Sequence, residues 1–115
     1  SINEMTGLVR QMLEQGLDAY VHNDEKAARK VAKLDLEIDK EYILIRNNIT
    51  ASMQQDSETV IANSGYMMVV RLLERMGDHI VILSEWIVYN ASGELVELNP
   101  GKKDPEMVQK LLNDK

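Results

Sequence analysis

One segment of the chain carries apolar residues at a regular helical spacing. From Ala27 to Met53 these positions follow one another in steps of 4, 3, 4, 4, 3, 4 and 4 residues. Such steps place the side chains on one face of an α-helix. The pattern therefore predicts a long amphipathic helix over residues 25–54. Its apolar stripe consists of Ala27, Val31, Leu34, Ile38, Tyr42, Ile45, Ile49 and Met53.

Two further helices are predicted, one on each side of this segment. Apolar residues recur at steps of three and four over residues 3–21, which indicates a shorter amphipathic helix. Residues 58–91 are apolar almost all round, as is typical of a helix buried on several sides. Asp24 is a good N-cap for the middle helix, and Gly93 is placed to end the last one.

The order of these elements predicts the fold class. No segment alternates polar and apolar residues between turn signals, so no strand is expected. We predict an all-α fold, an up-down-up antiparallel three-helix bundle formed by residues 1–99. Residues 100–115 are expected to be a tail with a short helix, because Asp104 and Pro105 are typical of a helix start. The apolar third helix is expected to leave a stripe open for self-association or docking.

Two pairs of acidic residues lie one helical turn apart on consecutive predicted helices. Asp35 and Asp39 form the first pair, and Glu74 and Asp78 form the second. Asp35 and Asp39 flank the predicted apolar stripe, so they can face the third helix. If the two helices turn back near residue 56, the centres of both pairs are equally far from the turn. All four carboxylates are therefore expected at about the same height on neighbouring helices.

This arrangement predicts a metal site. Carboxylates held close together stay ionised only if a cation neutralises them, and otherwise some keep their protons. Oxygen ligands without thiolates suit hard or borderline cations such as Mg, Mn, Ca or iron. The sequence does not distinguish between Fe, Mn, Mg and Zn. The predicted metal ligands are Asp35, Asp39, Glu74 and Asp78.

A solvated polar face is the alternative interpretation. Six ionisable residues share one arc of the third predicted helix, as they would on a face in water. Arg71 or Arg75 could pair with the acidic residues three and four positions away, so that no cation is needed. The same arc is apolar above and below these residues, which a long solvated face would not be. The residues expected to support the site are Arg71, Arg75, His79 and Glu85.

The composition and charge of the chain argue against several classes of function. The 115 residues carry a formal net charge of −6, which is a poor match for nucleic acid. There is no Cys, so a disulfide framework and a thiolate metal site are excluded. No leader and no membrane-spanning run is present, so we expect a cytoplasmic protein that reaches a membrane only through partners. No nucleophile with its base and no phosphate-binding glycine loop is found, and we therefore do not expect an enzyme.

The segment "RLLERMGDHIVILSEWIVYNASGE", residues 71–94, resembles the signature of the PhoU family of phosphate-transport regulators. The shared features are Leu-Glu-Arg, a hydrophobic residue, Gly-Asp-His, and then Glu-Trp and Tyr ahead of a Gly. The upstream segment "ARKVAKLDLEIDKEY" also resembles the family, and the likeness covers about residues 5–98. It implies a three-helix repeat in which the Glu/Asp-x-x-x-Asp motifs bind a metal cluster in some members.

The resemblance also implies a function and partners. The family acts as a negative regulator of phosphate uptake, and links the ATP-binding subunit of the phosphate ABC transporter to a membrane sensor histidine kinase. Typical members carry two tandem repeats, whereas this chain has the length of one and looks most like the C-terminal one. We therefore expect a fragment or a single repeat that forms a homo-oligomer. The alternatives are a metal-free helical interaction module and a PhoU-like domain of a sodium/phosphate cotransporter.

Overall fold

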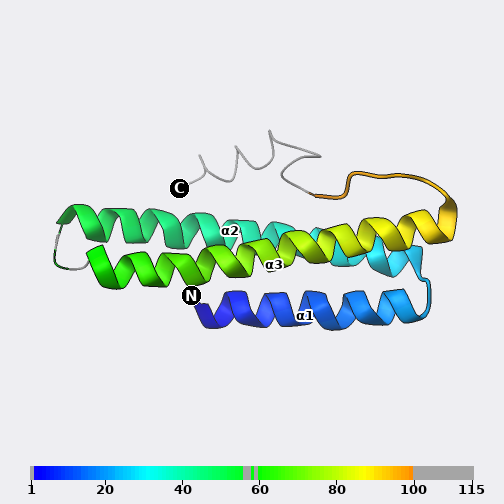
Figure 1. Cartoon of the computed structure of the whole chain (residues 1–115), viewed down its shortest axis with the longest axis horizontal. Coiled ribbons are helices and arrows are strands. Elements are labelled where there is room, and N and C mark those ends of the chain that lie inside the picture. Colours follow the sequence, from blue (N-terminus) through cyan, green and yellow to red (C-terminus); the bar gives the residue numbers. More distant parts are fainter. Residues whose placement is uncertain (1, 56–57, 59, 100–115) are drawn as a thin grey trace.

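Three antiparallel helices make up the bundle in the computed structural model of the chain (Figure 1). The structure describes residues 2–55, 58 and 60–99. Helix α1 spans Ile2–Val21, α2 spans Glu25–Gln55 and α3 spans Val60–Ser92, and the described residues contain no strand. The predicted all-α fold is confirmed, and the helix limits lie within two residues of those predicted. The short helix predicted near Asp104 lies outside the described residues.

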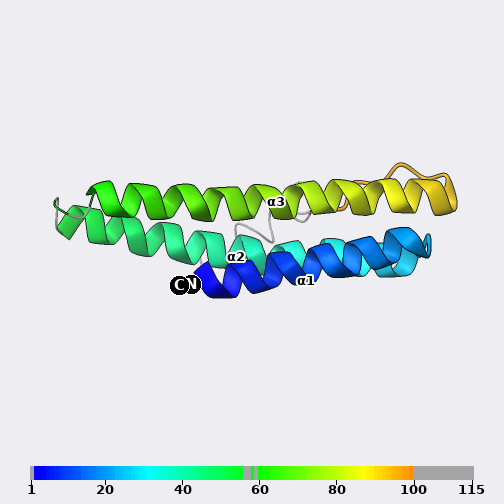
Figure 2. The ribbon, with the colours of Figure 1, turned by 60° about the horizontal axis from the view of Figure 1, so that its bottom comes forward.

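The connection between α1 and α2 is fixed by local chemistry. Asp24 Oδ1 accepts a hydrogen bond from the Ala27 N–H at 3.0 Å, so the predicted N-cap of α2 is confirmed. Asn23 has a φ of 49°, a conformation that Asn tolerates better than most residues. Gly93 ends α3 as predicted, with a φ of 77° and its N–H bonded to the Tyr89 carbonyl at 2.8 Å. The short α1–α2 turn brings these two helices side by side (Figure 2).

The buried face of α2 coincides only in part with the predicted stripe. Ala27 and Leu34 are only partly buried, whereas Asp35 is fully buried between core positions of the same helix. The physical reason is that the face turned toward both neighbours follows steps of 3, 4 and 3 residues, and Asp35 falls on it. Asp35 therefore lies within the core instead of flanking it. The buried positions in this part of α2 are Ala28, Val31, Ala32, Asp35 and Ile38.

Helix α3 packs against both other helices, but it is not buried all round. Met68, Leu72 and Met76 are 66%, 53% and 46% exposed. They are four residues apart, so they form one apolar stripe on the surface of α3. The expected open stripe is thus present, because two neighbouring helices cannot cover the full circumference of a third. None of the described helices combines the length and the apolar character needed to cross a membrane.

The residues after α3 turn back along that helix. This segment, residues 94–99, is called here the C-terminal strap (orange in Figure 1). Leu98 is 7% exposed and belongs to the core. Its N–H donates a hydrogen bond to Glu85 Oε2 at 2.9 Å. The strap is therefore attached to α3 through both apolar and polar contacts, and it ends near the middle of the bundle.

Candidate metal centre

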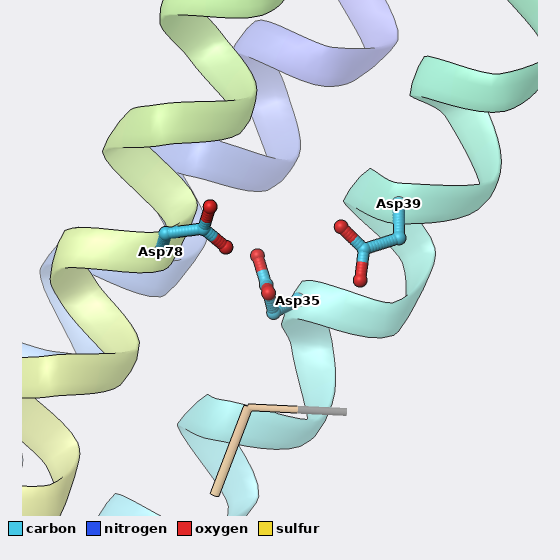
Figure 3. Close-up of side chains that lie close together, drawn as sticks. All are labelled: Asp35, Asp39 and Asp78. Atoms are coloured by element: carbon cyan, nitrogen blue, oxygen red, sulfur yellow. The ribbon is translucent and has the colours of Figure 1, made fainter. Parts of the chain in front are cut away.

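Three carboxylates from two helices converge at the centre of the α2–α3 hairpin. Asp35 and Asp39 project from α2 and Asp78 projects from α3, and their side chains point toward one another (Figure 3). One oxygen from each carboxylate lies within 4.8 Å of the others. The equal-height argument therefore places these three residues correctly. An antiparallel pair of regular helices fixes height from residue number alone.

Asp35 has no hydrogen-bond donor among the described residues. Its side chain is 0% exposed, and both of its carboxylate oxygens are buried without a partner. Buried polar atoms are almost always hydrogen-bonded, and an ionised carboxylate is especially costly to leave unpaired. The two oxygens therefore need a proton or a cation, and the close carboxylates of Asp39 and Asp78 increase that need.

A glycine on α3 makes room for this side chain. A Cβ atom at Gly77 would lie 2.5 Å from Asp35 Oδ1 and 3.2 Å from Ile38 Cδ1. The first separation is too short for any two non-bonded atoms of these types, so a side chain at Gly77 would force the Asp35 carboxylate to move. Gly77 is buried, and it allows the acidic residue of α2 to sit directly against α3.

The electrostatics of the cluster oppose full ionisation. Burial, followed by the charges of Asp39 and Asp78, raises the pKa of Asp35 to about 8. Burial and the charges of Asp78 and Glu74 raise the pKa of Asp39 to about 7. Asp35 and Asp78 could share a hydrogen bond only if one of them kept its proton, and this adds to the upward shift of the pKa of Asp35. Without a cation, protons must therefore be shared within the cluster at neutral pH.

Glu74 lies at the edge of the cluster and not inside it. It is half-buried and is absent from the group of three oxygens within 4.8 Å. Burial and then the charge of Asp78 raise the pKa of Glu74, whereas Arg75 and Arg71 lower it. Height along a helix does not fix rotation about its axis, so Glu74 is level with the cluster and interacts with Asp78 but does not join the group of three carboxylates.

The four expected supporting residues have different surroundings. Arg71 and Arg75 are exposed, and neither forms an ion pair with a cluster carboxylate within the part of the chain that is described. Their positive charges lower the pKa of Glu74. His79 is exposed. Glu85 accepts the hydrogen bond of the strap instead of joining the cluster.

One neighbour of the cluster was not anticipated from the sequence. Asn99, at the end of the strap, donates a hydrogen bond from Nδ2 to Asp78 Oδ1 at 3.2 Å. The strap has no helical or strand periodicity, so its path back along α3 leaves no sequence signal. The buried Leu98 just before Asn99 is the feature that holds it in place.

The carboxylate oxygens of the cluster are suitable ligands for a hard cation. Oxygen ligands lie about 2.0–2.6 Å from Mg²⁺ or Ca²⁺, so two ligands of one ion are at most about 5 Å apart. The three carboxylate oxygens lie within 4.8 Å of one another, which satisfies this limit. The unpartnered oxygens of Asp35 are the second, independent feature that favours a ligand at this place.

Known proteins resemble this chain along most of its length. The PhoU domain model matches residues 2–87. A relative from Clostridium acetobutylicum is 33% identical over 95 residues, which cover 83% of this chain and 43% of the relative. Relatives from Zymomonas mobilis and Caulobacter vibrioides are 32% and 35% identical over 99 and 94 residues, covering 85% and 82% of this chain and 42% and 41% of the relatives.

All three relatives are named phosphate-specific transport system accessory protein PhoU homologues. This chain spans about two fifths of their length. No solved structure matches it. Since the domain match covers well over half of the chain and includes both helices of the acidic cluster, the chain belongs to the PhoU family.

Proposed function

We propose that this chain is a regulatory module of a phosphate-transport system that acts by binding and not by catalysis. Its place in the PhoU family and the accessory role in the names of its relatives support this proposal. Its partners are the ATP-binding subunit of the phosphate ABC transporter and a sensor histidine kinase. In this role it restrains phosphate uptake, and the rigid bundle holds the contact surfaces in place.

The same module holds a metal ion at the acidic cluster. The observation that carries this proposal is the fully buried Asp35, whose two oxygens have no partner in the described part of the chain. Asp35, Asp39 and Asp78 would supply the oxygen ligands, with Glu74 beside them. A bound cation of the Mg, Mn, Fe or Zn type supplies positive charge, which neutralises the carboxylates and joins α2 to α3.

The module also pairs with a second copy of itself. The apolar stripe of Met68, Leu72 and Met76 supports this, because exposed apolar patches of this kind usually mark an interface. These side chains lie on the outer face of α3, where no other described element covers them.

The regulatory role is tested by phosphate uptake in cells that lack the gene. In phosphate-rich medium we expect elevated uptake of labelled phosphate, and the gene encoding this chain should restore the restrained rate. The Asp39→Asn, Asp78→Asn double variant should fail to restore it at equal protein level. Glu37→Gln, a change at an exposed carboxylate of the same helix, should behave as wild type. Unchanged uptake after deletion would contradict the regulatory role.

The metal site is tested by thermal unfolding of protein stripped with chelator. Added Mn²⁺ should raise the melting temperature, because a ligand that binds only the folded state stabilises it, by roughly 2.7 kcal/mol at a hundredfold excess over Kd. The Asp39→Asn, Asp78→Asn variant should lose this response, and Glu37→Gln should keep it. An equal rise in all three proteins would reject the cluster as the site.

The pH dependence of stability follows from the raised pKa values. Between about pH 4 and about pH 8 the metal-free folded protein binds more protons than the unfolded chain, because the folded pKa of Asp35 is raised to about 8. Its free energy of unfolding should therefore fall as pH rises through this range. One pKa unit corresponds to about 1.4 kcal/mol, and we expect a loss of at least this size.

Denaturant unfolding at several pH values measures this loss. Asp35→Asn removes the titrating group, so the variant should lose less stability as pH rises and should exceed the metal-free wild type at about pH 8. The same variant should respond less to Mn²⁺. Identical pH profiles for the two proteins would show that Asp35 does not hold a proton in the folded state.

Self-association is tested by multi-angle light scattering. The wild-type chain should have the mass of a dimer, and the Leu72→Glu, Met76→Glu variant should shift toward the monomer, since it places charges in the apolar stripe. Leu95→Glu is the matched control, because Leu95 is 82% exposed and lies outside the stripe. A monomeric wild type at high protein concentration would contradict the pairing.

A further inference from the structure

The C-terminal strap brings a side-chain amide to the acidic cluster. Besides the buried Leu98, polar contacts hold the strap at both of its ends. Arg29 and Glu94 are paired at 3.8 Å at its start. The Leu98 N–H donates to Glu85 near its end, and Asn99 Nδ2 lies 3.2 Å from Asp78 Oδ1. The last contact places an uncharged amide against a carboxylate of the candidate metal centre.

An asparagine amide can present either of two chemical faces. Its Nδ2 group donates hydrogen bonds and its Oδ1 atom accepts them, and rotation about the last side-chain bond exchanges the two. Toward a bare carboxylate the nitrogen is the favourable face, as in this structure. Toward a cation the oxygen is the favourable face, because amide carbonyl oxygens are ordinary ligands of hard cations.

The distance is right for a shared coordination shell. Two ligand atoms at right angles around an ion, each about 2.1–2.4 Å from it, are separated by about 3.0–3.4 Å. The Asn99 amide atom lies 3.2 Å from Asp78 Oδ1. An exchange of its nitrogen and oxygen would therefore place Oδ1 at ligand spacing from Asp78 without moving the strap.

We propose that Asn99 is a further ligand of the cation, through Oδ1, and that the strap is part of the metal site. This inference rests on the metal site proposed above. Binding of the cation would then hold the strap against α3, and a seated strap would in turn raise the affinity for the cation, because such coupling is reciprocal. Cation occupancy would thereby determine how firmly the strap is held against α3.

The test is Mn²⁺ titration of chelator-stripped full-length protein. Asn99→Ala should bind Mn²⁺ about tenfold more weakly than wild type. Losses of about tenfold to a hundredfold are typical when a group that supports a metal site is removed. Leu95→Ala, in the same strap but 82% exposed, should bind as wild type does. Asn99→Asp keeps an oxygen and loses the donor, so it should bind at least as tightly as wild type. A residue that only donates to Asp78 would make Asn99→Asp as weak as Asn99→Ala.

Hydrogen exchange supplies a second readout that does not depend on affinity. Saturating Mn²⁺ should slow amide exchange of the strap, including the Leu98 N–H, in wild type and Leu95→Ala but not in Asn99→Ala. If the Asp39→Asn, Asp78→Asn variant loses Mn²⁺ while Asn99→Ala binds like Leu95→Ala, Asn99 is not a ligand and the carboxylate site stands. If no variant changes Mn²⁺ binding, the carboxylate site fails, and the role of Asn99 fails with it.

Discussion

Burying a carboxylate without a donor is among the least favourable arrangements in a protein core, and Asp35 is buried without a donor among the residues that the structure describes. It occupies a core position of α2, against Gly77 of α3, with two further carboxylates next to it. The protonation of the acidic cluster at the centre of the hairpin depends on this placement. The cluster must take up either protons or a cation, and the choice between them changes how firmly α2 and α3 are held together.

At the proposed metal site, protons and cations would compete for one small group of carboxylate oxygens. Protonation removes the repulsion between carboxylates but leaves the two helices joined only by their apolar contacts. A cation at the proposed site would remove the same repulsion and add bonds to both helices, and these bonds would be lost at low pH because the ligands must be deprotonated. The proposed site would thereby give the bundle two states of different rigidity with one fold.

The helices and the height of the acidic residues along them could be predicted from the sequence, because both depend only on regular spacing. Steps of three and four fix the faces of the helices, and Asp24 marks a helix start through its own side chain. The burial of Asp35 was missed because a stripe built only from apolar residues passes over an acid at a core position. Gly77 acts by lacking a side chain, so it gives no hydrophobic signal. The position of the Glu74 side chain depends on the rotation of α3 about its axis. The path of the strap depends on the burial of Leu98 in the core. Residue spacing shows neither.

The unequal lengths of the helices have a consequence for local unfolding. At about 1.5 Å per residue, the 20 residues of α1 run along less than two thirds of the 31 residues of α2 and the 33 of α3. Of the described helices, only α2 and α3 reach the end of the hairpin that lies away from the α1–α2 turn (Figure 1). Segments with fewer packed neighbours open at lower free energy than the rest. Local opening of the described parts of α2 and α3 should thus occur more readily beyond the reach of α1 than beside it, so that the half with the acidic cluster keeps its shape.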